Sequence, residues 1–374
     1  MTRRRVALGA LLATAIAVAA VAIAIFAFGR GSGQQTRDLQ PLLDAVVDSG
    51  APGVILVTRD GVHSSHLASG AADPAAEQPI QASDRFRIGS VTKTFAAVVV
   101  LQLVAEGKLG LDDSVERWLP NLLRNGRRIT VRQLLGHRSG LFDYTDDQSV
   151  FRPYWSRPRF VWTPRRLIAL AQDHAPVFTP PGSQFAYSST NYLVLGLIAE
   201  RAARAPLGRQ LLERIFRPLG LRDTSFVPGP WRAFGEAHGF RVPSHDGIVS
   251  TGAAATDTGE YSASWAGAAG AIVSTADDLT RFFEALLGDR VLRPDLLRTM
   301  ETTRPPGRYG LGLATYQTRC GRAWGHTGSV LGYVTAVWNT KDARRQVVLM
   351  VNSYPFSAST DLAVRRALES AFCG

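Results

Sequence analysis

The sequence predicts a mixed α/β protein of the α+β class, in which one antiparallel sheet is built from both ends of the chain. Strand-like segments lie at residues 53–69 and again at 310–352, whereas residues 111–230 between them are helical and rich in loops. Because the strands gather at the two ends, we expect one sheet covered by helices, with a mostly helical lobe inserted in the middle.

The body of the chain is long enough for one domain with a large core. The sequence has 374 residues with an ordinary apolar content of 45%, and it shows no low-complexity tract or internal repeat. We expect residues 34–374 to form the domain. Its α/β lobe should take residues 36–90 together with 260–374, and its mostly helical lobe residues 91–259.

Residues 1–33 are predicted to be a signal peptide or a membrane anchor. Arg3, Arg4 and Arg5 precede an uncharged apolar run at 6–28, which is long enough to span a bilayer with its basic end in the cytoplasm. The length of the run favours an anchor, but small-residue triplets near its end leave cleavage open. In either case we expect an exported protein, either extracellular or anchored on the outer side of the membrane.

The first predicted elements are a helix, a hairpin and a second helix. Residues 39–49 have helical apolar spacing, and 53–60 and 62–69 are strands joined at Asp60-Gly61, a dipeptide typical of tight turns. Residues 91–105 form an apolar helix.

The middle of the chain adds further helices. Thr130 is placed to cap a helix at 131–135, and residues 191–203 have the pattern of a long apolar helix. Residues 268–275, rich in small side chains, are expected to be a strand. A helix at 276–287 follows, with acidic residues in its first turn as the helix dipole prefers.

Four strands and a helix complete the predicted fold. The strands are expected at 310–316, 322–327, 332–339 and 346–352, and the closing helix at about 359–372. Together with the first hairpin, these strands supply the sheet.

The net charge of +11 indicates either a solvated surface rich in arginine, which is the simpler interpretation, or attraction to anionic surfaces such as lipid headgroups or wall polymers. The arginines are scattered and no nucleic-acid-binding motif appears, so we expect no nucleic-acid partner. His137 is interpreted as loop scaffolding. No metal and no cofactor are expected, because the remaining histidines outside the later motifs lack metal-ligand spacing; they are His63, His66, His174, His238 and His245.

Two cysteines, Cys320 and Cys373, lie late in the chain. In an exported protein an even pair predicts a disulfide, whereas two buried thiols are the alternative. Closing a loop of that length would stabilise the fold by about 4 kcal/mol on the chain-entropy model.

The strongest chemical signal is Ser90, which lies at the start of an apolar helix with Lys93 three residues later. Residues three apart share a helix face, so the amine should lie beside the hydroxyl. A serine needs a neighbouring base to become a nucleophile, and burial at a helix start lowers the pKa of a lysine. Only three of the 42 basic residues are lysines, and lysine, unlike arginine, can give up its proton.

Two later segments add candidate groups. Tyr187 lies in a loop that leads into the helix at 191–203, where a tyrosine near Lys93 can transfer protons as phenol or phenolate. His326 lies at the end of a predicted strand between glycines that let the backbone approach a ligand. Taken alone, either residue would more often be structural.

Together these segments resemble the penicillin-recognising serine hydrolases, in particular exported D-alanyl-D-alanine carboxypeptidases and the related class C β-lactamases. The resemblance extends over nearly all of residues 40–374 and implies a β-lactamase/DD-peptidase-like fold. Besides Ser90-x-x-Lys93 and Tyr187, the segments that carry it are 86–95, 102–109, 129–141, 216–224, 309–313 and 326–328.

The resemblance implies a role for each matching residue. Ser90 is the acylated nucleophile, Lys93 its partner and base, and Tyr187 the group that passes a proton to the leaving group. His326 occupies the third catalytic motif. The resemblance further implies an oxyanion hole from the backbone N–H groups of Ser90 and Ser329, and substrate contacts from Thr327, Gly328 and Trp265. The Cys320–Cys373 pair is similar to a disulfide of the carboxypeptidase relatives.

Two departures from the family pattern concern specificity. Ser189 stands where the second motif normally has an asparagine. Hydrogen bonding to the acylamido group of a substrate should therefore be weaker. Ala314 stands where the carboxypeptidases carry an arginine for the substrate's terminal carboxylate, and Arg319 or Arg322 is a possible substitute.

The expected function is that of an exported serine hydrolase that forms an acyl-serine intermediate. Peptidoglycan peptides ending in D-Ala-D-Ala are the first-choice substrate, with penicillins as acylating agents and a monomer as the expected state. An esterase or a β-lactamase on the same scaffold is the alternative. A penicillin-binding or cell-wall-sensing protein with little turnover is the alternative from another class. Which group acts as the acylation base is disputed within this superfamily.

Overall fold

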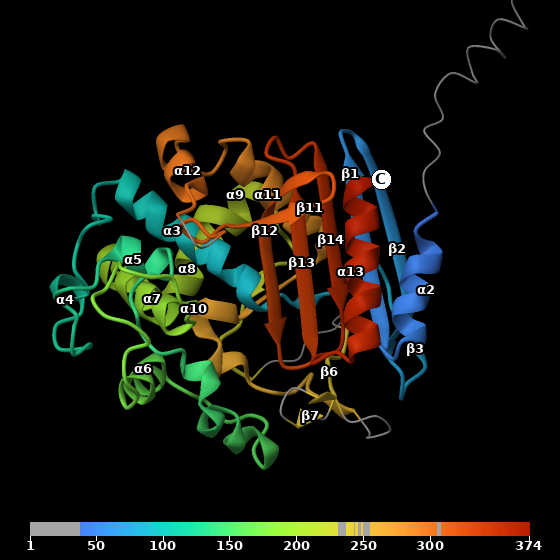
Figure 1. Cartoon of the computed structure of the whole chain (residues 1–374), viewed down its shortest axis with the longest axis horizontal. Helices are drawn as coiled ribbons and strands as arrows, with labels where there is room; N and C mark the ends of the chain where they lie inside the picture. The colour runs from blue at the N-terminus through green and yellow to red at the C-terminus, as the bar shows by residue number, and fades with distance from the viewer. Residues whose placement is uncertain (1–37, 231–236, 243, 246–247, 250–254, 305–307) are drawn as a thin grey trace, which may run out of the picture. The chain divides into compact units, whose positions relative to one another are not determined.

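Strands from both ends of the chain form one antiparallel sheet in the computed structural model, which confirms the predicted fold class (Figure 1). In the described residues the sheet has seven strands in the order β11-β12-β13-β14-β1-β2-β3. They are β1 (Gly53–Asp60), β2 (His63–Asp73), β3 (Gln78–Pro79), β11 (Ala314–Thr318), β12 (Gly321–Val330), β13 (Tyr333–Asn339) and β14 (Arg345–Val351).

The structure describes residues 38–230, 237–242, 244–245, 248–249, 255–304 and 308–374. All the elements discussed below belong to the compact unit Leu39–Gly374. The predicted signal peptide or anchor at 1–33 lies outside the described residues. Within the described ranges, no helix is both long enough and apolar enough to cross a bilayer.

Helices surround the sheet and fill the inserted lobe. The longer ones are α2 (Gln40–Asp48), α3 (Thr92–Ala105), α6 (Pro164–Gln172), α7 (Thr190–Ala203), α11 (Ala276–Leu287), α12 (Pro294–Glu301) and α13 (Ala358–Cys373). Among the shorter ones are α4 (Val115–Trp118), α5 (Val131–Leu135), α8 (Leu207–Leu211), α9 (Arg217–Leu219) and α10 (Gly267–Gly270).

The central strand β1 is buried on both faces because each face of the sheet packs against helices. Val54 and Leu56 belong to a core shared with α2 and α13, whereas Ile55 belongs to the larger core that contains α3. This is the alternation that a strand imposes on its side chains. Figure 1 shows α13 running along the strands of the sheet, next to β14. The predicted disulfide between Cys320 and Cys373 is present and ties α13 to the β11–β12 turn.

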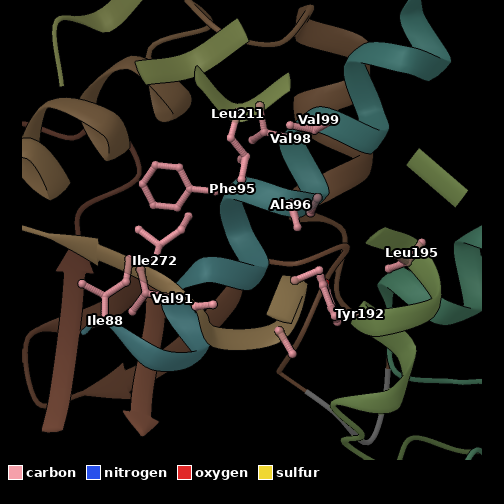
Figure 2. Close-up of a cluster of buried hydrophobic side chains, with 14 of the residues drawn as sticks. Ile88, Val91, Phe95, Ala96, Val98, Val99, Tyr192, Leu195, Leu211 and Ile272 are labelled. Carbon is pink, nitrogen blue, oxygen red and sulfur yellow. The ribbon is translucent and has the colours of Figure 1, made fainter. Parts of the chain in front are cut away.

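Helix α3 is apolar on every side, which is the pattern of a helix enclosed by other elements. Phe95 stacks on Phe282 of α11 with a ring-centroid distance of 3.6 Å, and meets the edge of Phe216 at 6.0 Å. Figure 2 shows Phe95 of α3, and Val91 just before the helix, among apolar side chains from neighbouring elements. The core therefore fixes the position and axis of the helix whose first turn follows Ser90.

Two predicted strands need correction. Residues 268–275 divide into the end of α10 and a short strand, β10 (Ile272–Ser274). The N–H of Ala271 donates to the carbonyl of Gly267 at 3.0 Å, so the small residues form a helical turn first. The strand predicted at 310–316 begins only at Ala314, because residues 310–313 form a tight turn closed by the Gly310 N–H and the Leu313 carbonyl.

Candidate active site

Ser90 lies in a single 3₁₀ turn, η1 (Gly89–Val91), that leads directly into α3. The turn packs against β12 so closely that only glycine fits on either side. Gly89 has a φ of +52°, and a Cβ there would lie 2.8 Å from the Ser329 backbone nitrogen. A Cβ on Gly328 would lie 2.7 Å from the backbone nitrogen of Ser90. The two glycines thus allow the backbone nitrogens of Ser90 and Ser329 to approach each other.

The amine of Lys93 lies beside the Ser90 hydroxyl, as the three-residue spacing predicts. Its Nζ atom is 2.9 Å from Ser90 Oγ, 3.0 Å from the Ala269 carbonyl oxygen and 3.5 Å from Ser189 Oγ. A neutral amine has two N–H donors and one lone pair. If the neutral amine donates to Ala269 and Ser189, its lone pair is left to accept the proton of the Ser90 hydroxyl, as a general base requires.

Burial makes this neutral form accessible at ordinary pH. Lys93 is 1% exposed. Burial lowers the pKa of its amine to about 7, while the negative charge of Asp143 partly opposes the change. The main cause of the lowered pKa is burial, which removes water from the charged ammonium form of Lys93 and so disfavours it.

This shift predicts that the stability of the fold depends on pH. Unfolded Lys93 binds a proton between pH 7 and about 10 that the folded protein does not hold, so the free energy of unfolding should rise across that window. Relative to Lys93→Met, we expect the parent to gain roughly 3–4 kcal/mol from pH 7 to pH 10, at about 1.4 kcal/mol per unit. Denaturant unfolding of both proteins at the two pH values measures this difference. A difference that stays constant with pH would contradict the buried, neutral lysine.

Tyr187 meets the same two groups. Its ring centroid lies 4.9 Å from Lys93 Nζ, and its hydroxyl is near enough to Ser90 for that residue to affect the pKa of Tyr187. Burial of the hydroxyl end raises the pKa of Tyr187 well above the ordinary range, even though the residue as a whole is 40% exposed. Tyr187 is therefore a phenol at neutral pH, and as such it can donate or relay a proton.

His137, which the sequence analysis interpreted as loop scaffolding, holds the tyrosine in place. The ring is fully buried and stacks on Tyr187 with a centroid distance of 4.1 Å. Its Nδ1 accepts the N–H of Ser188 at 3.1 Å and lies 3.2 Å from Asn191 Nδ2. Burial, followed by the charge of Lys93, lowers the pKa of His137 well below its usual value. A neutral imidazole of fixed tautomer thus packs against one face of the Tyr187 ring and holds it in position.

Asp143 is a second residue of the site that the sequence analysis missed. It is buried, and its Oδ2 accepts the backbone N–H of Ser189 at 2.9 Å, while Oδ1 accepts from the N–H and hydroxyl of Thr145. Its carboxylate follows the 129–141 segment closely, but no local pattern distinguishes it from a surface aspartate. The structure places it in contact with the turn that carries Ser189.

His326 lies in a buried layer rather than in the cleft. Its Nδ1 pairs with the Thr327 carbonyl at 2.5 Å, so Nε2 accepts the hydroxyl of Tyr309 at 2.8 Å. Burial and the charge of Lys93 lower the pKa of His326 to about 3. The imidazole is therefore neutral at ordinary pH, and both of its nitrogens are occupied internally. A direct part for His326 in proton transfer stays a prediction, and the geometry favours a supporting position.

The candidate groups open onto one cleft of about 620 Å³. Six of the predicted site residues line it: Ser90, Lys93, Tyr187, Ser189, Trp265 and Ser329. Further side chains on its walls, which the sequence did not single out, include Asp143, Asp146, Phe151, Arg241 and Tyr354.

The remaining predicted substrate contacts, Thr327 and Gly328, do not line this cleft. Thr327 is exposed, and its Oγ1 accepts the hydroxyl of Tyr316 at 3.3 Å, whereas Gly328 provides the close contact with η1 described above. Trp265 is held on the wall by an edge contact with Phe151 at 4.9 Å. In the described part of the chain no cluster of histidine, cysteine and acidic residues is suited to a metal ion.

Comparison with known proteins relates this geometry to established enzymes. Residues 37–371 match the family model described as Beta-lactamase. Esterase EstB of Burkholderia gladioli is 32% identical over 334 residues, which cover 79% of each chain.

Solved structures show the same relationship. A D-stereospecific amidohydrolase from Streptomyces sp. superposes with a TM-score of 0.80 at 34% identity, covering 88% of this chain and 97% of the amidohydrolase. The D-amino acid amidase from Ochrobactrum anthropi SV3 gives a TM-score of 0.78 at 28% identity, covering 89% and 97% of the two chains. Because the family model spans almost the whole described domain, the chain belongs to the β-lactamase family of penicillin-recognising serine hydrolases.

Proposed function

We propose that this protein cleaves amide or ester bonds through an acyl-serine intermediate on Ser90. The observation that carries the proposal is the 2.9 Å contact between Ser90 Oγ and the buried amine of Lys93, whose pKa is lowered to about 7. The cleft beside this pair gives an acyl group access to the hydroxyl.

In the acylation step Lys93 takes the proton of Ser90 as Oγ bonds to the carbonyl carbon of the substrate. The negative charge then develops on the carbonyl oxygen, to which we expect the backbone N–H groups of Ser90 and Ser329 to donate. Oxyanion donors of this kind contribute roughly 3–4 kcal/mol each in other hydrolases.

Collapse of the tetrahedral intermediate breaks the bond to the leaving group, which must receive a proton. Tyr187 contacts both Ser90 and Lys93, so its phenol can donate to the departing nitrogen or oxygen and recover a proton from the Lys93 ammonium. Water then attacks the acyl-serine, and the same groups reverse their roles to release the acid.

For the substrate we infer a short amide or peptide with a free ammonium group near the scissile carbonyl. Asp143 and Asp146 line the cleft, and with Lys93 neutral their negative charge attracts a cation. Ser189 in place of the family's asparagine removes an amide that would hold an acylamido group. The relatedness to a D-amino acid amidase and a D-stereospecific amidohydrolase supports the same substrate class.

Asp143→Asn tests this inference. Turnover of D-alanine p-nitroanilide should fall about tenfold to a hundredfold in kcat/KM, mainly through KM, because an ion pair to the ammonium is lost. The desamino analogue, propionyl p-nitroanilide, should keep its rate within about twofold. Since Asp143 raises the pKa of Lys93, the acid limb of the pH profile should also move to lower pH. Equal losses on both substrates would reject ammonium recognition.

Hydrolysis of peptides ending in D-Ala-D-Ala is the second candidate activity, and the three catalytic motifs favour it. The arginine expected for the terminal carboxylate is absent at Ala314, and neither Arg319 nor Arg322 lines the cleft. Comparing diacetyl-Lys-D-Ala-D-Ala, D-alaninamide, p-nitrophenyl esters and a cephalosporin separates carboxypeptidase, amidase, esterase and β-lactamase. We expect the amide to have the highest kcat/KM.

The alternative from another functional class is a binding or sensing protein whose serine becomes acylated but which turns over little substrate. Ser189 and the apolar segment at 6–28 motivate it. Multiple turnover of any substrate in the panel rejects this alternative, whereas labelling by a fluorescent penicillin without multiple turnover supports it.

Export, with or without a retained membrane anchor, and a monomeric state are part of the proposal. Fractionation of the producing cells tests export, and light scattering tests the oligomeric state.

A further inference from the structure

Arg241 brings a positive charge to the wall of the cleft, far from where the family pattern would place one. It belongs to the short strand β6 (Phe240–Arg241), which pairs with β9 (Thr256–Asp257). The backbone of Phe240 is held by its N–H, which lies 2.9 Å from the Asn352 carbonyl, and by its carbonyl, which accepts the Tyr354 N–H at 3.0 Å. The strand that carries Arg241 is therefore fixed to the main sheet.

In the described part of the chain the guanidinium group stacks on an aromatic ring and has no acidic partner. Its central carbon lies 4.3 Å from the ring centroid of Trp155, which is 49% exposed. Stacking occupies a face of the guanidinium and leaves its in-plane N–H donors available for a carboxylate. Within the described residues no salt bridge joins Arg241 to an acidic side chain.

The position along β12 indicates which half of the substrate Arg241 can reach. The Phe240 N–H also donates to the carbonyl of Gly332, just beyond the end of β12. Ala314, where the resemblance expects the arginine for the leaving-side carboxylate, pairs with Gly325 in the middle of that strand. Gly325 lies four strand residues before Ser329, roughly 13 Å at 3.3 Å per residue, whereas Gly332 follows Ser329 in the turn after the strand. Arg241 therefore lies on the side of Ser90 opposite to the leaving-group position.

We propose that Arg241, stacked on Trp155, forms a subsite for a carboxylate on the acyl half of the substrate. This inference rests on the proposed function, because it names a substituent of the group that Ser90 would carry. Combined with Asp143, it describes an acyl group derived from an amino acid with a free ammonium and an acidic side chain.

Matched chromogenic substrates test the proposal. The α-p-nitroanilides of D-glutamate and D-glutamine have nearly the same shape but differ in side-chain charge, and those of D-aspartate and D-asparagine form a shorter pair. The parent enzyme should prefer an acidic member about tenfold to a hundredfold in kcat/KM, as expected for a charge-assisted bidentate contact. Arg241→Gln should abolish the preference through KM and leave the neutral substrate within about twofold. Arg241→Lys should retain part of it.

The control is Arg209→Gln, which removes an exposed arginine of an i,i+4 ion pair with Glu213, away from the cleft, and should leave the preference unchanged. The subsite would be overturned if the parent enzyme preferred neither acidic substrate. It would also be overturned if Arg241→Gln and Arg241→Lys lowered kcat/KM equally on charged and neutral substrates. Treatment with p-nitrophenyl acetate, with acylation of Ser90 followed by mass spectrometry, distinguishes failure of the subsite from failure of the proposed function. If Ser90 is acylated but the preference is missing, only the subsite fails; if Ser90 is not acylated, the proposed function and the subsite fail together.

Discussion

Ser90→Ala is expected to lower kcat on the best amide substrate by a factor on the order of a million, in line with nucleophile deletions in other serine hydrolases. The variant keeps the backbone N–H of residue 90 and the η1 turn, so the cleft should still bind substrate and KM should change little. Steady-state kinetics with freshly purified protein measures both parameters.

Ser64→Ala supplies the matched control, because Ser64 is exposed on β2 and the same hydroxyl is removed far from the cleft. Its kcat should equal that of the parent. A residual rate above a tenth of the parent in Ser90→Ala would reject Ser90 as the nucleophile.

Lys93→Met should lower kcat/KM by about 10³–10⁴, within the range of general-base contributions. Methionine fills similar volume but cannot accept the Ser90 proton. In the parent, kcat/KM should rise with pH and level off above an apparent pKa near 7, because only the neutral amine acts as a base. This rise should be absent from the residual activity of the variant.

Two further lysine substitutions make the result specific. Lys93→Arg should be as inactive as Lys93→Met, because a guanidinium stays protonated at working pH. Lys108→Met removes an exposed lysine paired with Glu106 and should leave kcat/KM unchanged. A pH profile that is flat between pH 5 and 9 in the parent would show that the buried amine is not the base.

The contact between Ser90 and Lys93 could be predicted because it is local. Three residues of helix fix the two side chains on one face, whatever the rest of the chain does. The long apolar helix that begins just after Ser90 and carries Lys93 was equally predictable, since α3 is apolar on all sides. Tyr187 needed the family resemblance, because nothing local brings a residue of a distant loop to within 4.9 Å of Lys93.

Other parts of the site depend on packing between distant segments. Asp143 contacts the Ser189 N–H, and His137 stacks on Tyr187, across about 50 residues of sequence in each case. No periodicity marks such contacts. The Ala269 carbonyl that binds Lys93 lies at the end of α10, where small residues suit a helix and a strand almost equally.

The central claim is that Ser90 carries the acyl group. Its most direct test is the intact mass of the protein, quenched in acid after treatment with penicillin or during turnover of a p-nitrophenyl ester, followed by peptide mapping. We predict one added acyl group per chain, on the peptide that contains Ser90, with no adduct in Ser90→Ala. An adduct on another residue, or turnover with no adduct at any quenching time, would contradict the account.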